Sequence, residues 1–357
     1  MADEAWRGGG PGGRNGGRAY IGSFTSAGGR GIVAATVDSR TGAPVVTGAS
    51  DEVVDPSFLA VAPGGDVLYA VSETEEGALA AFDVTGPAPR LLGAPVPVGG
   101  QHPTHLALAG GRAFTANYGS GSVSALFLAP DATPRPAAQV LTHRGSGPHP
   151  QRQTGPHAHQ VVPAPGGGWV LGVDLGTDSV RVHALDPATG RLVPHGETAL
   201  GPGTGPRHLA FHPSGSHVYV LAELAPVIAA CRWDAATGAL EPVGRPAALP
   251  TRADAVTYPS GIVASPDGRF LWAALRGDDT VAVLELDGTR ERPRPVTTVP
   301  CGGHWPRALA LDPSGRRLYV ANERSGDVTW FDLDPTTGVP SRVGSIEVPA
   351  ASCVVFT

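Results

Sequence analysis

Short apolar runs alternate with turn residues along most of this chain, and the alternation repeats. Each unit opens with a Pro-containing turn, continues as an apolar run, turns at a Pro-x-Gly or Gly-Gly segment, and then gives a second and a third apolar run. Apolar residues at helical spacing are absent. The units start at prolines that lie 47, 53, 50, 53 and 47 residues apart, namely Pro56, Pro103, Pro156, Pro206, Pro259 and Pro306. This long period, with three or four short strands in each unit, predicts an all-β fold, the β-propeller.

The two ends of the chain predict how the ring closes. The first segment, from Ala19, matches a unit from its second strand onward and lacks the apolar strand that should precede it. The last residues, from Ala351, form a single apolar strand with no unit after it. Pairing this strand with the first segment completes a seventh blade and removes two exposed sheet edges. We therefore predict a seven-bladed β-propeller over residues 18–357, preceded at 1–17 by a flexible Gly- and Arg-rich tail.

Composition agrees with a folded, turn-rich protein. Of 357 residues, 50 are Gly and 36 are Pro, and they are spread between the apolar runs as turns between short strands require. No stretch approaches the roughly 18 consecutive apolar residues of a membrane helix. The acidic start, Met1-Ala2-Asp3-Glu4, lacks the apolar core of a signal peptide. We expect a cytoplasmic protein without a membrane partner.

Charge and missing motifs narrow the possible functions. All 26 basic residues are Arg and the formal net charge is −6, so Lys-based covalent chemistry is excluded and a nucleic-acid partner is not expected. The sequence contains neither a Gly-rich phosphate loop nor a G-x-S-x-G elbow. The scattered cysteines, Cys231, Cys301 and Cys353, are expected to be small buried residues of a protein in a reducing compartment.

Polar and titratable residues gather at strand ends that share one face of the predicted disc. Because adjacent strands of a blade are antiparallel, the start of the first strand and the end of the second lie on the same face. Residues at the first position are Ser57, Thr104, His105, His157, His159, Arg207, His208, Ser260 and Arg307. Residues at the second position are Glu73, Asn117, Tyr118, Asp174, Glu223, Arg276, Asn322 and Glu323. The opposite face receives mainly turn residues, so we expect the functional site at one mouth of the central channel.

Several motifs on this face carry a family resemblance. They are ANYGSGSV at 116–123, GPHAH at 155–159, GPRHLAFHPSG at 205–215, AEL at 222–224 and LRGDD at 275–279. With them the chain resembles, over nearly its whole length from Ala19, the lactonase family of seven-bladed propellers. That family includes propeller-type 6-phosphogluconolactonases and 3-carboxy-cis,cis-muconate lactonizing enzymes. The resemblance implies an enzyme without metal or organic cofactor.

The resemblance also implies an active site at His159, Arg207, Glu223 and Arg276. The motifs depart from the usual pattern at Ala222, where many members have Asn, and at 274–275, where they have Ser-Asn. Blade six also starts without the acidic residue often seen before Gly261. These departures lie around the implied site and leave the identity of the substrate open.

The residue types suit lactone chemistry. A histidine such as His159 can pass a proton to or from water, whereas Glu223 can act as a base or orient Arg207. Arg207 and Arg276 can bind an anionic group or the oxyanion formed at a lactone carbonyl. An Arg beside Glu223 would hold that carboxylate ionised. Further substrate contacts are expected from His157, His105, Asn117 and Arg307. Because His157 and His159 are two apart in a strand, both should point to the same side.

Three functions remain open from the sequence. The first is a cofactor-independent hydrolase of a small anionic lactone, most simply 6-phosphogluconolactone or a related sugar-acid lactone. The second is a cycloisomerase that forms or opens a lactone with the same groups, and the third is a non-catalytic binding scaffold. A Ca²⁺ site is a further alternative, but a pair of histidines with arginines fits an anion better. Its ligands would be Glu73, Asn117, Asp174 and Glu323. The oligomeric state stays open.

Overall fold

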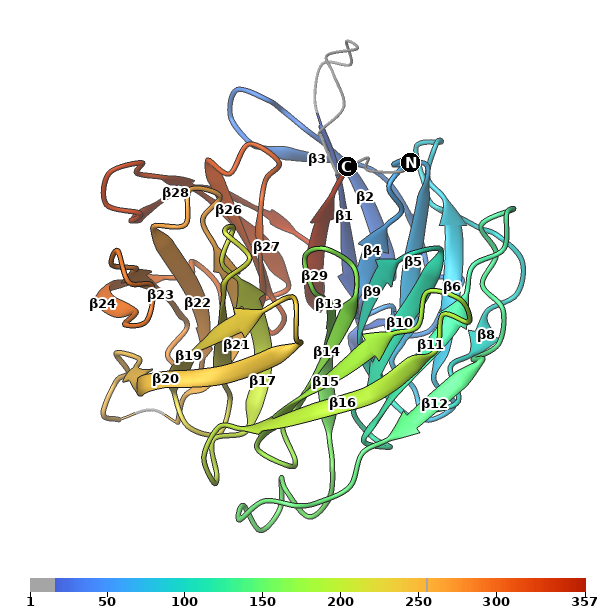
Figure 1. Cartoon of the computed structure of the whole chain (residues 1–357). Coiled ribbons are helices and arrows are strands. Elements are labelled where there is room, and N and C mark those ends of the chain that lie inside the picture. Colours follow the sequence, from blue (N-terminus) through green and yellow to red (C-terminus); the bar gives the residue numbers. More distant parts are fainter. Residues whose placement is uncertain (1–16, 255) are drawn as a thin grey trace.

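Seven antiparallel sheets surround a common axis in the computed structural model, which describes residues 17–254 and 256–357 (Figure 1). Blade 1 consists of β29 (Ala351–Phe356), β1 (Gly17–Ser23), β2 (Ile32–Val37) and β3 (Pro44–Ser50), with a short 3-10 helix, η1 (Thr25–Ala27). Blade 2 consists of β4 (Leu59–Val61), β5 (Val67–Ser72), β6 (Ala78–Asp83), β7 (Arg90–Leu91) and β8 (Val96–Pro97). Blade 3 consists of β9 (Pro103–Ala109), β10 (Arg112–Asn117), β11 (Ser122–Phe127) and β12 (Gln139–Thr142).

The remaining blades repeat the same four-stranded meander. Blade 4 consists of β13 (Ala158–Pro163), β14 (Trp169–Asp174), β15 (Ser179–Leu185) and β16 (Leu192–Ala199). Blade 5 consists of β17 (Pro206–Phe211), β18 (His217–Ala222), β19 (Val227–Asp234) and β20 (Ala239–Ala248). Blade 6 consists of β21 (Tyr258–Ala264), β22 (Phe270–Arg276), β23 (Thr280–Glu285) and β24 (Arg294–Pro300). Blade 7 consists of β25 (Pro306–Leu311), β26 (Arg317–Asn322), β27 (Asp327–Leu333) and β28 (Pro340–Glu347).

The C-terminal strand closes the ring. β29 pairs with β1 in antiparallel register, with Val355 opposite Tyr20, and supplies the first strand of blade 1. The predicted fold and its closure are thus confirmed. Residues 1–16 of the tail expected at 1–17 lie outside the described residues, and the bound at 17 was wrong by one residue because Gly17 is the first residue of β1.

Packing between blades explains why the repeat is visible in the sequence. A blade in a ring is covered on both faces by its neighbours, so its middle strands are buried on both sides. All seven residues of β22 are buried, whereas the outermost strand β24 is mostly exposed or half-buried. Between blades 5 and 6, Tyr219 and Leu221 of β18 belong to the same core cluster as Leu271 and Leu275. The three cysteines are buried and free, as expected.

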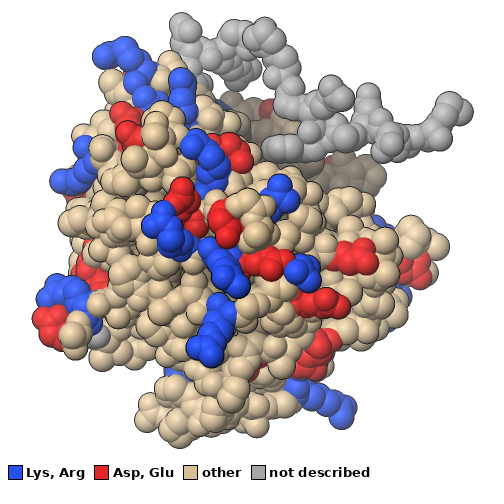
Figure 2. Space-filling model, turned by 60° about the vertical axis from the view of Figure 1, so that its left-hand side comes forward, with Lys and Arg blue, Asp and Glu red and all other residues tan. Residues whose placement is uncertain are grey.

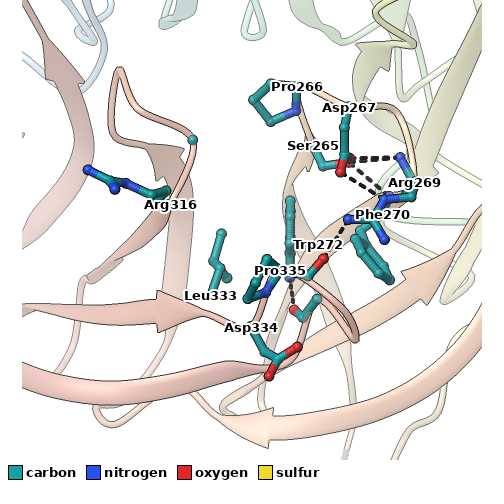
Figure 3. A pocket seen from close by; sticks show the side chains of 12 residues that line it. Ser265, Pro266, Asp267, Arg269, Phe270, Trp272, Arg316, Leu333, Asp334 and Pro335 are labelled. Carbon is teal, nitrogen blue, oxygen red and sulfur yellow. Dashed lines mark hydrogen bonds and ion pairs between the residues drawn. The ribbon is translucent and has the colours of Figure 1, made fainter.

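The outer surface and the face of the strand turns carry ordinary surface chemistry. Figure 2 shows basic and acidic side chains interspersed over the face in view. On the side of the Asp-Pro-Ser-Gly turns, a pocket of about 110 Å³ lies between blades 6 and 7 (Figure 3). Its wall is fixed by Trp272 Nε1, which donates to Gly338 O at 2.8 Å, and by the Arg269–Asp267 ion pair. Ligand pockets usually reach roughly 300 Å³ or more, so this one is too small for a sugar lactone. Within the described ranges, the structure has no helix with the length and apolar character needed to span a membrane.

Candidate active site

A register shift near the start of the first strand recurs in blade 1 and in blades 3 to 7. It falls at Ser352, Thr104, His159, Arg207, Ser260 with Gly261, and Arg307. Such bulges break the two-residue alternation of a strand and re-aim a side chain, and they are common beside active sites. The shifted residues reach from one blade to the next: Thr104 Oγ1 donates to His159 O at 3.0 Å, Arg207 Nη1 donates to Ser260 O, and Ser260 Oγ donates to Pro306 O at 2.6 Å. The same local distortion thus aligns the predicted residues around the inner strands.

Glu223 lies at the centre of an arginine cluster. Its Oε2 is 3.0 Å from Arg207 Nε and 2.7 Å from Arg276 Nη2, while its Oε1 accepts from Arg152 Nη2 at 2.6 Å. The Glu223 side chain is only 4% exposed. Arg207 comes from β17, Arg276 from the end of β22, and Glu223 follows β18. Three of the four expected catalytic residues therefore come together across blades 5 and 6, because Glu223 contacts both Arg207 and Arg276.

The arginines fix the charge of Glu223. Burial alone would raise the pKa of this carboxyl, but Arg276, Arg207 and Arg152 lower it to about 2. The carboxylate is ionised at neutral pH, and both of its oxygens contact guanidinium groups. A carboxylate of such low pKa is a poor proton acceptor at pH 7. Its geometry suits the second role expected for it, orienting the arginines.

Three buried histidines lie beside this cluster, one from each of blades 3, 4 and 5. The ring of His208 lies 5.6 Å from that of His105 and 5.3 Å from that of His159. Burial and the charge of Arg207 lower the pKa of His105 to about 3 and hold those of His159 and His208 well below 6.5. All three imidazoles are therefore neutral at pH 7.

Hydrogen bonding distinguishes His159 from His105 and His208. Within the described part of the chain, Nδ1 of both His159 and His105 is buried without a hydrogen-bond partner, but only His159 lacks a side-chain contact at its other ring nitrogen as well. Arg207 Nη1 lies 3.4 Å from His208 Nε2, and Gln160 Nε2 lies 3.5 Å from His105 Nε2. His159 is therefore the histidine best placed to exchange a proton with a bound water or substrate.

His157 differs from His159 in its surroundings. Strand β13 begins only at Ala158, and the bulge at His159 interrupts the alternation on which a common orientation was expected. The half-buried ring of His157 stacks on Tyr118 at 4.4 Å, and its Nδ1 lies 2.9 Å from Tyr118 O. The edge of Tyr118 also meets His159 at 5.6 Å. Tyr118 thus separates the two histidines.

Arg307 and Asn117 belong to neighbouring networks. Arg307 Nη1 donates to Glu323 Oε2 at 3.0 Å, and its Nη2 lies 3.6 Å from Glu73 Oε1. Asn117 is fully buried, and its amide is satisfied by Thr115, Ser122 and Ser124 of its own blade. Among the described residues, no contact joins Asn117 to the arginine cluster, and its hydrogen bonds support blade 3.

The residues of the alternative cation site are likewise held apart. Asp174 pairs with the buried His143 at 2.6 Å and accepts from the backbone N–H of His157 at 2.9 Å. Glu73 and Glu323 share Arg307, as described above. Among residues 17–254 and 256–357, no three His, Cys, Asp or Glu side chains gather as a metal site requires. Asp174 instead positions the segment that leads to His159.

Arg152 is the member of the cluster that the sequence analysis missed. It lies in the connection between β12 and β13, outside the strand ends on which the repeat focused attention. The next residue, Gln153, is fully buried and anchors this connection by donating to Leu175 O at 2.8 Å and to Asp178 Oδ1 at 2.7 Å. Arg152 Nη2 also donates to Tyr118 Oη at 3.3 Å. A polar segment with Arg and Gln just before GPHAH was the available signal.

The combined networks favour an anionic ligand. Arg152, Arg207, Arg276 and Arg307 supply four guanidinium groups against the carboxylates of Glu223, Glu73 and Glu323. Burial raises the pKa of Glu73 despite the nearby Arg307, which weakens one of these carboxylates as a counter-ion. Buried charges need partners, so an anion that enters beside the arginines gains strong, charge-assisted hydrogen bonds.

Comparison with known proteins decides the family. The profile of the family described as "Lactonase, 7-bladed beta-propeller" matches residues 18–356. This chain belongs to that lactonase family. It is 30% identical over 343 residues to a 6-phosphogluconolactonase of Bacillus subtilis, covering 94% of this chain and 97% of the relative. It is 29% identical to a 6-phosphogluconolactonase of Formosa agariphila, covering 89% and 93%. The structure of a periplasmic gluconolactonase of Pseudomonas aeruginosa matches with a TM-score of 0.87 and 28% identity, covering 95% and 98%.

The comparison confirms the family that the motifs suggested. The matched range spans all seven blades and therefore every residue of the arginine and histidine clusters. The expectation of a lactonase is confirmed at the level of the family.

Proposed function

We propose that this lactonase-family protein hydrolyses 6-phosphoglucono-1,5-lactone, or a closely related sugar-acid lactone, at the arginine and histidine clusters. The names of its relatives support the class of substrate. The observation that carries the proposal is the contact of one ionised carboxylate with three arginines, beside neutral buried histidines. Such a site can hold a developing negative charge and move a proton without a charged histidine in the resting state.

In this mechanism the arginines stabilise the oxyanion. Attack of water on the lactone carbonyl carbon places a negative charge on the carbonyl oxygen. Arg207 and Arg276 supply fixed guanidinium donors for that charge, because Glu223 holds both groups in place before the substrate arrives. Preorganised donors of this kind provide a large part of catalysis in acyl transfer.

His159 is the proposed proton carrier. Its neutral imidazole accepts a proton from the attacking water and passes it to the ring oxygen as the bond between that oxygen and the carbonyl carbon breaks. The product is a hydroxy acid, which ionises at neutral pH and releases one proton to solvent. Burial lowers the pKa of His159, and the charges of Arg207, Arg307 and Arg276 lower it further. Negative charge on the bound substrate offsets the effect of the arginines and strengthens His159 as a base.

The test is a proton-release assay on the purified chain, after subtraction of the uncatalysed rate. We expect turnover of 6-phosphogluconolactone, and Arg207→Ala should lower kcat/KM by roughly a hundredfold or more, as loss of an oxyanion donor does. Arg232→Ala is the matched control, because Arg232 is an exposed arginine paired with Glu291. Unchanged kcat/KM in folded Arg207→Ala would refute the assigned role. Turnover of an unsaturated muconolactone in place of sugar lactones would favour the cycloisomerase.

A further inference from the structure

A second arginine, outside the cluster around Glu223, lies close to Arg276. The ring of Trp305 joins the two: Arg276 Cζ is 5.5 Å from its centroid, and Arg324 Cζ is 3.4 Å from it. The two guanidinium carbons are therefore at most 8.9 Å apart. Trp305 is half-buried and Arg324 is exposed. This arrangement extends the site from the buried arginines toward solvent.

The backbone of Trp305 is held in a conformation that bulky residues rarely adopt. Its φ is 66°, in the left-handed region. The residue before the proline of a unit has a positive φ in several blades, but elsewhere it is Asp55, His102 or Gly205. Of these, Gly205 adopts the conformation with least steric cost because it has no Cβ. A tryptophan here points to a use for its ring, since such outliers cluster at functional sites.

Hydrogen bonds fix this segment from two sides. Trp305 N donates to Asp279 Oδ1 at 2.8 Å, and Glu323 N donates to Trp305 O at 3.1 Å. Asp279 also pairs with the imidazole of His304. The indole is thereby positioned by the loop after β22 and by the end of β26, the same elements that end in Arg276 and lead to Arg324.

Arg324 differs from the other arginines near the site. Arg207, Arg276 and Arg152 contact Glu223, and Arg307 contacts Glu323. In the ranges that the structure describes, no carboxylate lies within ion-pair distance of the Arg324 guanidinium, whose contact is the face of Trp305. Stacking orients a planar guanidinium and leaves its N–H groups free to bind a phosphate through two hydrogen bonds.

We propose that Arg324, positioned by Trp305, binds the terminal phosphate of the substrate and sets a preference for phosphorylated over unphosphorylated sugar lactones. The inference rests on the proposed function, which places the lactone carbonyl at Arg207 and Arg276. The short separation of Arg276 and Arg324 suits a single hexose unit that carries its lactone at one end and its phosphate at the other. Arg324 is then a substrate-binding residue, and Trp305 is a positioning residue.

The test compares kcat/KM of full-length variants on 6-phosphogluconolactone and on glucono-1,5-lactone. Arg324→Ala should lower kcat/KM for the phosphorylated lactone by about tenfold to a hundredfold, as loss of a charge-assisted contact does. Its effect on glucono-1,5-lactone should stay within about twofold, because that substrate lacks the phosphate. Arg316→Ala removes the same charge from an exposed position beside the pocket of Figure 3 and should change neither value. Equal losses on both lactones, or no loss, would overturn the proposal.

Variants of Trp305 test the positioning role separately. Glycine adopts the left-handed conformation freely, so Trp305→Gly removes the ring without backbone strain. It should reproduce the loss of phosphate preference with an intact fold, whereas Trp305→Phe should retain most of the preference by keeping an aromatic face. If Trp305→Gly kept the preference for the phosphorylated lactone, Trp305 would have no positioning role.

A binding measurement distinguishes failure of this inference from failure of the proposed function. Titration calorimetry with 6-phosphogluconate and with gluconate requires no turnover. If Arg324→Ala weakens binding of 6-phosphogluconate but not of gluconate, the phosphate contact is supported. This holds even if the wild-type chain hydrolyses neither lactone, because absence of hydrolysis would refute only the proposed function. Equal binding of 6-phosphogluconate by the wild-type chain and the variant would refute the phosphate contact.

Discussion

Replacement of Glu223 by Gln isolates the charge at the centre of the arginine cluster. The substitution keeps the shape of the side chain and removes its negative charge, leaving Arg152, Arg207 and Arg276 around a neutral amide. In the native chain the pKa of Glu223 falls from its ordinary value of 4.5 to about 2. At about 1.4 kcal/mol for each tenfold change in acidity, this difference corresponds to about 3 kcal/mol of stability at pH 7. Loss of one partner from a buried ion pair costs a similar amount, about 3 to 5 kcal/mol.

The assay is urea unfolding of wild-type and Glu223→Gln proteins across a pH series. Because the folded-state pKa is depressed, the stabilisation is fully present above pH 4.5 and is lost as the pH falls toward 2. The difference between the two proteins should therefore be constant from pH 7 to about pH 5 and shrink below that. Glu285→Gln is the matched control, because its ion pair with Arg294 is exposed and should contribute less than about 1 kcal/mol.

A free energy of unfolding for Glu223→Gln within about 1 kcal/mol of the wild-type value at pH 7 would refute the stabilising role of the Glu223 charge. Equal losses of unfolding free energy in Glu223→Gln and Glu285→Gln would refute it as well, since burial would then have no effect on the strength of the ion pair. If Glu223→Gln were as stable as the wild type but had a low kcat/KM, Glu223 would contribute mainly to catalysis and little to stability.

Two further predictions concern the proposed proton carrier, His159, and Arg152, which the strand ends did not reveal. Burial and three arginines hold the pKa of His159 well below 6.5, so its active neutral form persists as the pH falls through 6.5. We therefore expect kcat/KM to stay level between pH 8 and 6.5. A fall in kcat/KM with a midpoint at pH 6.5 would contradict this prediction. His159→Gln should lower kcat/KM by about a hundredfold or more at every pH in that range. Arg152→Ala removes the half-exposed partner of Glu223, so stability should change by no more than about 1 kcal/mol while kcat/KM falls. Arg144→Ala is the control, because it removes the same charge from the same loop, and it should leave kcat/KM unchanged. Equal effects of Arg152→Ala and Arg144→Ala on kcat/KM would refute a specific role for Arg152.

The sequence predicted the fold well because ring closure imposes the same requirement on every blade. Each middle strand must be apolar on both faces, as β22 is, and each unit must turn at nearly the same spacing, so the period survives even where residues differ. The incomplete first unit and the extra last strand could have only one common explanation, which the pairing of β29 with β1 bears out. These features depend on the spacing of apolar runs and turn residues, which can be read from a single sequence.

The site was predictable only as far as strand ends determine it. The antiparallel meander places Arg207, Glu223 and Arg276 on one face, and the structure joins them. Alternation along a strand, however, could not predict the bulge at His159, which gives that residue surroundings unlike those of His157. Arg152 reaches Glu223 from a connection whose path depends on the hydrogen bonds of the buried Gln153. These tertiary contacts do not follow the sequence repeat, so the repeat could not predict them.

In the proposed mechanism, the charge balance of the site links binding of the substrate to its reaction. Burial depresses the pKa of His159, and the arginines that attract an anion depress it further, so His159 is a weak base before substrate binds. A bound phosphorylated lactone brings negative charge that offsets the arginines' part of this depression, and the developing oxyanion at Arg207 and Arg276 adds more. Both effects raise the basicity of His159 as the proton transfer proceeds. The same guanidinium groups therefore favour both the binding and the reaction of an anionic substrate. With a neutral lactone of equal shape, only the developing oxyanion raises the basicity of His159.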